Sequence, residues 1–312
     1  MDPLTSIQRC VAACLAAGLL VGIAHAAIPD MDSAGGLAAK YAELRGQLAS
    51  NQYRKPLYLE SSESPQGVTG DIYALVNHPF AASAAALSSP RDWCEILILP
   101  INTKYCRAAT GAPGSVLHVS IGKKYYQPVD QAYRLDFEYR VIAQSSSYLR
   151  VKLNAETGPL STRDYRIVLE AVPLDSGRTF IHLSYSYAFD TIGRLAMQLY
   201  LATGGRSKVG FTVTGMQADG QPLHIGGTRG VVERNTMRYF LAIEAFLGAL
   251  PMPVQARLEK RLQDWFAAAE RYPRQLHELE QDEYLEMKRK EHLRQQSGLP
   301  KESANVQDAS TG

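Results

Sequence analysis

The sequence predicts an α+β protein in which a large antiparallel sheet precedes a long helix. Strand-like segments follow one another over residues 116–189, each alternating or β-branched, with Gly, Pro, Ser and Asp at the joins. In the clearest, residues 133–141, odd positions are apolar or aromatic and even positions are charged, which is typical of a sheet with one buried face. The pattern then changes to a long helix over residues 227–250, which Pro251 and Pro253 terminate.

Shorter elements are predicted before this core. Four side chains at helical spacing predict an amphipathic helix over residues 36–51: Leu37, Tyr41, Leu44 and Leu48. Residues 55–62 alternate and predict a first strand, and residues 95–101 predict another. Residues 71–87 are apolar and rich in alanine. We expect them to begin extended and to become helical after Pro79, since proline suits a first helical turn.

The strand-rich region divides into five predicted strands. They are residues 116–121, 133–143, 148–156, 163–172 and 178–189. Residues 175–177 (DSG) predict a tight turn between the last two. The remaining predicted elements are a short helix over residues 191–201, a strand over residues 208–214 and a helix over residues 254–269.

The N-terminal residues have the anatomy of a cleaved secretory signal. A short polar start with one basic residue, Arg9, precedes an apolar run over residues 10–23, and residues 24–26 (AHA) give the pattern of a signal-peptidase site. The run is too short to span a bilayer comfortably. The sequence therefore predicts a mature chain from about Ala27, in a bacterial periplasm or secreted. The alternatives are an uncleaved anchor helix and a lipoprotein box ending at Cys14.

The bulk composition is that of an ordinary globular protein. The chain has 312 residues, of which 46% are hydrophobic and 21% are charged, and its net charge is +2. A nucleic-acid binder usually carries a concentrated basic face, so the charge argues against that class. No apolar stretch after residues 10–23 reaches membrane-spanning length, so no transmembrane segment is expected after signal cleavage.

The cysteines fit an oxidising compartment. Two of the four, Cys10 and Cys14, lie in the signal, whereas Cys94 and Cys106 remain in the mature chain. We expect this second pair to form a disulfide that flanks a strand and turn. The chain between them lacks a Cys-x-x-Cys motif, and no histidine lies at ligand spacing from either cysteine. Neither redox catalysis nor a metal site is therefore predicted, and no cofactor is expected.

The order of elements resembles that of the START / Bet v 1-like (SRPBCC) superfamily. The resemblance covers residues 57–250 and rests on element order and on three segments. They are GDIYALVNHPF (70–80), GPLSTRDYRIVLEA…GRTFIHLSYSYAF (158–189) and GGTRGVVERNTMRYFLAIEAFL (226–247). This chain departs from the simplest members in its extra helix over residues 191–201 and in its charged C-terminal tail.

The resemblance implies a helix-grip fold, in which a curved antiparallel sheet grips a long C-terminal helix around an apolar cavity. Members of this superfamily bind lipids, sterols or other hydrophobic ligands, and some are cyclases or hydroxylase components. The predicted division of the chain is as follows: a signal peptide (1–26), a leader with a short helix (27–54), a START-like domain (55–250), a helical extension (251–296) and a disordered tail (297–312).

An aromatic sheet face covered by one helix makes a concave apolar pocket, the usual form of a ligand site. The 17 tyrosines against 8 phenylalanines indicate a lining with polar tips, since a buried tyrosine hydroxyl needs a partner. The candidate ligand-binding residues of the strands are Tyr133, Phe137, Tyr139, Tyr165, Tyr185 and Tyr187. Those of the long helix are Met237, Phe240, Leu241 and Glu244. The alternative is that these side chains simply fill a core.

Charged residues in the same elements give a second indication. Glu233 and Glu244 fall on the apolar stripe of the long helix, where an unpaired carboxylate would be costly. Arg163 shares strand parity with Tyr165, so we include it in the ligand site as an inward-pointing partner of one of these carboxylates. The alternative is that the stripe is half exposed and that these charges lie in water.

Three hypotheses of function follow. The leading one is a periplasmic binding or carrier protein for a hydrophobic small molecule, a lipid in particular. The second is an enzyme, a cyclase or hydrolase, that uses Arg163, Glu244 or His182 as acid or base, although the sequence shows no Gly-x-Ser-x-Gly or His-Glu-x-x-His motif. The third is an interaction protein whose charged segment, residues 273–296, is a solvated helix or docks on an envelope partner.

Overall fold

The computed structural model describes residues 32–111, 114–175, 177–190 and 208–298. The predicted signal peptide, the helix expected over residues 191–201 and nearly all of the tail expected to be disordered lie outside these ranges. Among the described helices, none combines the length and the apolar character needed to cross a membrane.

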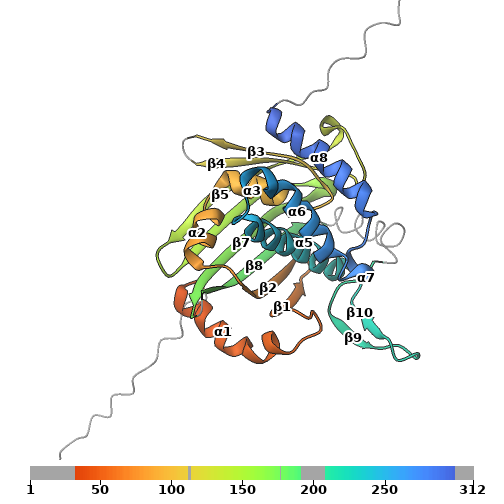
Figure 1. Ribbon diagram of the computed structural model, residues 1–312. Helices are drawn as coiled ribbons and strands as arrows, with labels where there is room; N and C mark the ends of the chain where they lie inside the picture. Colours follow the sequence, from red (N-terminus) through yellow and green to blue (C-terminus); the bar gives the residue numbers. More distant parts are fainter. Residues whose placement is uncertain (1–31, 112–113, 176, 191–207, 299–312) are drawn as a thin grey trace, which may run out of the picture.

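A large antiparallel sheet of eight strands forms the body of the molecule (Figure 1). Its strand order is β1-β2-β8-β7-β6-β5-β4-β3, so sequence-distant β2 and β8 pair near one edge. The strands are β1 (Leu57–Glu63), β2 (Gly67–Val76), β3 (Thr103–Thr110), β4 (Ser115–Ile121), β5 (Tyr133–Gln144), β6 (Leu149–Thr157), β7 (Thr162–Leu174) and β8 (Arg178–Phe189). The antiparallel sheet predicted from the alternation of residues 133–141 is confirmed.

The long helix α5 (Gly227–Ala249) lies across one face of the sheet, which curves around it (Figure 1). Two shorter helices, α2 (Phe80–Leu87) and α3 (Pro90–Leu97), cover the rest of this inner face, and α6 (Val254–Ala269) packs against α5. The chain therefore has the helix-grip fold expected from its sequence. Both predicted late helices are confirmed.

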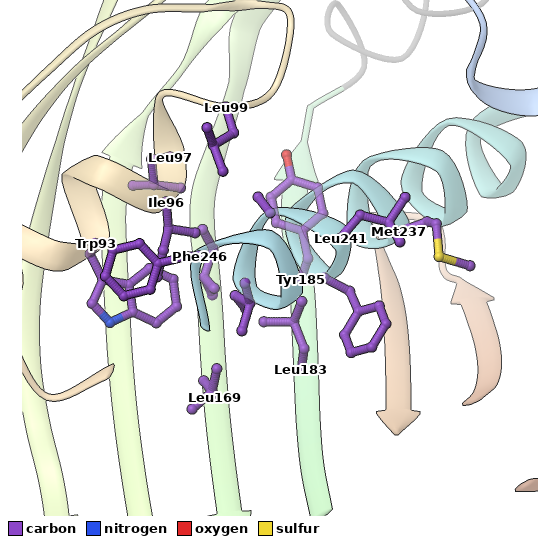
Figure 2. Close-up of a cluster of buried hydrophobic side chains, with 14 of the residues drawn as sticks. Trp93, Ile96, Leu97, Leu99, Leu169, Leu183, Tyr185, Met237, Leu241 and Phe246 are labelled. Carbon is purple, nitrogen blue, oxygen red and sulfur yellow. The ribbon is translucent and has the colours of Figure 1, made fainter. Parts of the chain in front are cut away.

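The core lies between the inner face of the sheet and these helices. Figure 2 shows Leu169 and Leu183 of the sheet pointing toward Leu241 and Phe246 of α5, with Trp93 of α3 beside them. All five side chains are at most 1% exposed. Because 15 residues of α5 are buried, this helix is gripped around most of its circumference and not along a single stripe.

The outer face of the sheet carries a second, smaller core under α1 (Ala34–Ala49). Ser33 caps this helix, and Leu37, Leu44 and Leu48 pack on Tyr73 and other outer-face residues. The helix predicted over residues 36–51 is confirmed, and so is the change from strand to helix at Pro79.

The C-terminal extension closes the inner side of the molecule. A short turn of helix, α7 (Pro273–Leu276), leads into α8 (Gln281–Ser297), which packs on β3 and α6. Tyr284 of α8 is fully buried, and its ring stacks on Trp265 at 5.0 Å. The segment expected to be a solvated helix or a docking tail is therefore helical, but its apolar side is buried in the same domain.

The strand predicted over residues 95–101 is wrong. These residues begin inside α3, whose first turn has Ser89 as its cap and Pro90 at its first position, and they end in the turn before β3. A short continuous apolar run fits a buried helix as well as a buried strand, which is why the pattern misled.

Two further differences concern short strands. The strand β3 was not predicted. Of the strand expected over residues 208–214, only its end joins β9 (Val213–Met216), which pairs with β10 (Pro222–His224) in a separate hairpin. Two 3-10 turns complete the described elements: η1 (Val129–Gln131) and η2 (Pro159–Ser161).

Candidate functional site

Tyrosine rings gather where β7 and β8 face α5. Tyr165 stacks on Tyr187 with ring centroids 5.3 Å apart and lies 6.3 Å from Tyr185. Tyr239 of α5 meets the ring of Tyr185 edge-on at 5.2 Å. We call these four residues the tyrosine cluster. Three of them were predicted from the sequence, and the structure brings them together as expected.

Tyr239 is the member of the cluster that the sequence analysis missed. It lies off the stripe of Met237 and Leu241 that was taken to face the sheet. The signal that could have found it is the apolar character of α5 on several sides, which indicates a helix enclosed by the sheet.

The hydroxyl groups of the cluster differ in their partners. The hydroxyl of Tyr165 lies 2.7 Å from that of Thr162. The hydroxyl of Tyr187 is buried, and it has no hydrogen-bond partner among the described residues. Burial raises the pKa of Tyr165, Tyr185, Tyr187 and Tyr239, so all four remain protonated and can donate hydrogen bonds. A buried donor without a partner costs free energy that a bound acceptor would recover.

The other predicted aromatic and apolar residues divide into core and surface. Phe137, Met237 and Phe240 are at most 4% exposed and form part of the core. Tyr139 is buried too, and its hydroxyl donates to the carbonyl of Leu87 at 3.2 Å. For these four the alternative of plain core filling fits their packing.

Two predicted site residues are not in the interior. Tyr133 is 56% exposed, because it lies at the first position of β5, beyond the helices that cover the inner face. Arg163 is exposed and its guanidinium lies 3.5 Å from the carboxylate of Asp164. The pairing of β7 with β8 shifts between Arg163 and Arg166, and Asp164 has a φ of 53°, so a β-bulge breaks the strand parity on which the inward orientation rested.

The two helix carboxylates find other partners than Arg163. Glu233 is fully buried and accepts hydrogen bonds from Ser61, from both backbone and side chain of Thr212, and from the backbone of Phe211, at 2.6–2.9 Å. Four donors satisfy this carboxylate, so it fixes the segment before β9 and is not a free acid or base.

Glu244 lies at the opposite end of α5, where it pairs with Lys55. Together with Leu241, these residues border a surface cavity of about 360 Å³. His78 lines the same cavity, and burial lowers the pKa of its imidazole. Leu241 and Glu244 are thus two predicted site residues that line an open cavity, about as large as the smaller ligand pockets of proteins.

His182, which the enzyme hypothesis named as acid or base, lies on the outer face under α1. Its Nδ1 is 2.9 Å from the carboxylate of Glu170 and its Nε2 is 3.0 Å from that of Asp71. Both ring nitrogens are therefore occupied, and Glu170 also accepts from the hydroxyl of Tyr148. A histidine held on both sides is a structural cation and not a proton shuttle.

The predicted disulfide is confirmed. Cys94 of α3 and Cys106 of β3 are bonded, so the bridge ties the helix to the neighbouring strand. Among the described residues, no group of three or more His, Cys, Asp or Glu side chains could hold a metal ion.

No protein-family model and no curated protein matches the chain. Solved structures do match. Norcoclaurine synthase from Thalictrum flavum is 14% identical, with 48% of this chain and 80% of that chain covered and a TM-score of 0.31. A START superfamily protein from Mycobacterium smegmatis is 14% identical, with 45% and 96% covered and a TM-score of 0.30. A conserved protein from Geobacillus kaustophilus is 12% identical, with 59% and 95% covered and a TM-score of 0.34. At these TM-scores the matches carry no statement about ligand or activity.

Proposed function

We propose that the protein is exported to the periplasm and there binds a hydrophobic small molecule, a lipid in particular, between the sheet and α5. The tyrosine cluster is the proposed contact with the polar group of that ligand. The observation that carries the proposal is the buried hydroxyl of Tyr187, which has no partner among the described residues. Apolar pockets with a few placed polar groups are the usual form of small-molecule sites.

Two members of the tyrosine cluster also border clefts at the protein surface. Tyr187 borders a surface cleft of about 510 Å³, and Tyr165 borders a larger cleft of about 1010 Å³ on the outer side. Aromatic rings supply apolar contact area, and their protonated hydroxyls supply hydrogen-bond donors. A ligand with an apolar body and one hydrogen-bond acceptor fits this combination.

Native mass spectrometry of the mature, oxidised protein from its own periplasm, followed by solvent extraction, tests the proposal. We expect a stoichiometric extra mass that extracts as one lipid class, on a chain that begins near Ala27. A bare protein that also takes up no component of a bacterial phospholipid mixture would refute the carrier function.

The variant Tyr187→Phe tests the proposed contact. Removing an unpaired buried hydroxyl should stabilise the ligand-free protein by about 1 kcal/mol, because an unsatisfied polar group is no longer buried. The same change should weaken the stabilisation by the extracted ligand. Thermal unfolding with and without that ligand measures both effects.

Tyr139→Phe is the matched control, because the hydroxyl of Tyr139 already donates to Leu87. This variant should lose about 1 kcal/mol of stability and keep its response to ligand. If Tyr187→Phe also lowered the stability of the ligand-free protein and left the response to ligand intact, the hydroxyl would not be the contact.

The other two hypotheses have less support. The acid or base roles suggested for Glu244 and His182 are weakened by their ion pairs with Lys55, Asp71 and Glu170. The envelope partner proposed for residues 273–296 would have to bind the exposed side of α8, since its apolar side is buried in the domain.

A further inference from the structure

A cleft of about 460 Å³ opens between the end of α1 and the start of β1, on the side of the sheet opposite to α5. Its charged lining is entirely cationic. Arg45 of α1, Arg54 and Lys55 of the following loop, and Arg178 at the start of β8 border it, and none of the described lining residues is acidic. We call this the α1 cleft. It is separate from the tyrosine cluster, which faces α5.

Two of these cations are available to a ligand. Arg45 and Arg54 are exposed, and within the described part of the chain neither makes an ion pair. Lys55, by contrast, is neutralised by Glu244 from the neighbouring cavity. Cationic side chains that share a cleft with no carboxylate attract an anion from solution.

The loop that carries Arg54 is held in place. The side-chain amide of Asn51 donates to the carbonyls of Gln47, Leu48 and Lys55 at 2.8–3.2 Å, and its oxygen accepts from the backbone of Tyr53 at 2.9 Å. These bonds connect the last turn of α1 with the loop that precedes β1.

Within this loop, Arg54 has a φ of 55°, a left-handed conformation that is uncommon for arginine. A residue in such a rare backbone conformation persists only where surrounding contacts hold it. Residues of this kind are often found at binding sites. The arginine is therefore held at the cleft at a cost in conformational free energy.

The lining also has an apolar part. Tyr41, Leu48 and Pro56 border the cleft, and the guanidinium of Arg45 lies over the ring of Tyr41 at 5.4 Å. A volume of about 460 Å³ lies within the range of small-molecule sites of roughly 300–1,000 Å³. A bare inorganic anion would leave this apolar surface unused.

We propose that the α1 cleft binds a phosphate group carried on an apolar body, independently of the ligand proposed for the tyrosine cluster. Guanidinium groups present donors in a fork that matches phosphate oxygens. A phosphate monoester carries about −1.5 to −2 charges, so it pairs with more than one arginine, whereas one carboxylate is neutralised by a single arginine.

The test is calorimetric titration of the full mature protein with three soluble probes in a low-salt, phosphate-free buffer. Dihexanoyl phosphatidic acid should bind, and dihexanoyl phosphatidylcholine and inorganic phosphate should bind at least tenfold more weakly. Affinity for the first probe should fall with added salt, because the arginines are exposed. Equal binding of the choline lipid would refute recognition of a phosphate monoester. Equal binding of inorganic phosphate would refute a contribution of the apolar body to binding.

The double variant Arg45→Gln/Arg54→Gly should bind dihexanoyl phosphatidic acid at least tenfold more weakly than the wild type. Glycine at 54 keeps the left-handed backbone without strain, so the loop should stay folded. Its matched control is Arg91→Gln/Arg107→Gln, which removes the same charge from exposed positions outside the cleft. The control should bind within twofold of the wild type. Equal losses in both variants, or no binding by the wild type, would overturn the proposal.

Discussion

The imidazole of His182 holds its proton more tightly in the folded protein than in the unfolded chain. Burial by itself lowers the pKa of the imidazole, but the hydrogen-bonded carboxylates of Asp71 and Glu170 outweigh this effect and raise the pKa from 6.5 to about 9. The ring of Tyr73 stacks on the imidazole at 4.3 Å. Since a pKa change of one corresponds to about 1.4 kcal/mol, the charged form stabilises the fold by on the order of 3 kcal/mol.

The sign of this effect predicts a pH dependence. A raised folded-state pKa gives stability that is complete below about pH 6.5 and is lost as the pH rises through about 9. The variant His182→Gln lacks this titration. The difference in unfolding free energy between wild type and variant should therefore shrink between pH 6.5 and pH 9. Urea titrations at several pH values measure it, and a constant difference would contradict the assignment of a charged His182.

Single residues also mark the limits of prediction from the sequence. Tyr165, Tyr185 and Tyr187 could be predicted as neighbours because strand alternation assigns them to one face. The exposure of Arg163 could not, since it depends on a bulge at Asp164 that alternation does not reveal. The four donors that surround Glu233 could not be predicted either, because three of them come from Phe211 and Thr212, which lie before β9 in a segment that was predicted as a strand.

At the scale of elements, α8 is attached to β3 by a buried charge network. The carboxylate of Glu291 lies 3.0 Å from Lys104 of β3 and 2.7 Å from Lys288, and all three side chains are fully buried. Burial lowers the pKa of both lysines, that of Lys288 to about 8, although Glu291 opposes the shift. Two ammonium groups thus depend on one carboxylate.

Glu291→Gln should loosen this attachment. Removing one partner of a buried ion pair leaves an uncompensated charge, which typically costs about 3–5 kcal/mol. The exposed pair of Glu286 and Lys290 on the same helix offers a control, since Glu286→Gln breaks only a solvent-screened pair and should leave the stability nearly unchanged. Amide hydrogen exchange over residues 281–297 should accelerate in Glu291→Gln alone. Unchanged protection in that variant would show that the network does not hold α8.

The elements themselves were predictable to the extent that their patterns were periodic. The strand β5 and the helix α5 follow from alternation and from length. The helix α3 does not, because residues 96–99 form an unbroken apolar run that both states can bury. The cap at Ser89 and the proline at position 90 are the local signals that favour the helix.

At the scale of the whole molecule, the two faces of the large sheet carry different features. The inner face grips α5 and holds the tyrosine cluster, whereas the outer face holds α1, the His182 ion pairs and the cationic α1 cleft. The proposed ligand sites therefore lie on opposite sides of one sheet. The sequence could predict the gripped helix from element order, but not the second core, because the outer-face pairing of α1 depends on contacts between distant segments.

The burial of its apolar side chains makes α8 a part of the domain and not an appendage. Beyond its charges, α8 buries Tyr284, Leu285 and Met287, and the hydroxyl of Tyr284 donates to the carbonyl of Leu99 at 2.9 Å. Burying side chains of this size contributes about 1.5–3 kcal/mol each. An interaction tail would be removable without such a cost.

Deletion of residues 281–312 should therefore lower the melting temperature by roughly 10 °C or more, given about 2–4 °C per kcal/mol in domains of this size. A thermal scan of the truncated chain beside the full chain measures this. An unchanged melting temperature would make α8 an appendage and revive the docking hypothesis. For the same reason, a partner of α8 must be sought with exposed-face variants of the full chain, such as Glu286→Gln, because a truncated chain that unfolds loses every partner at once.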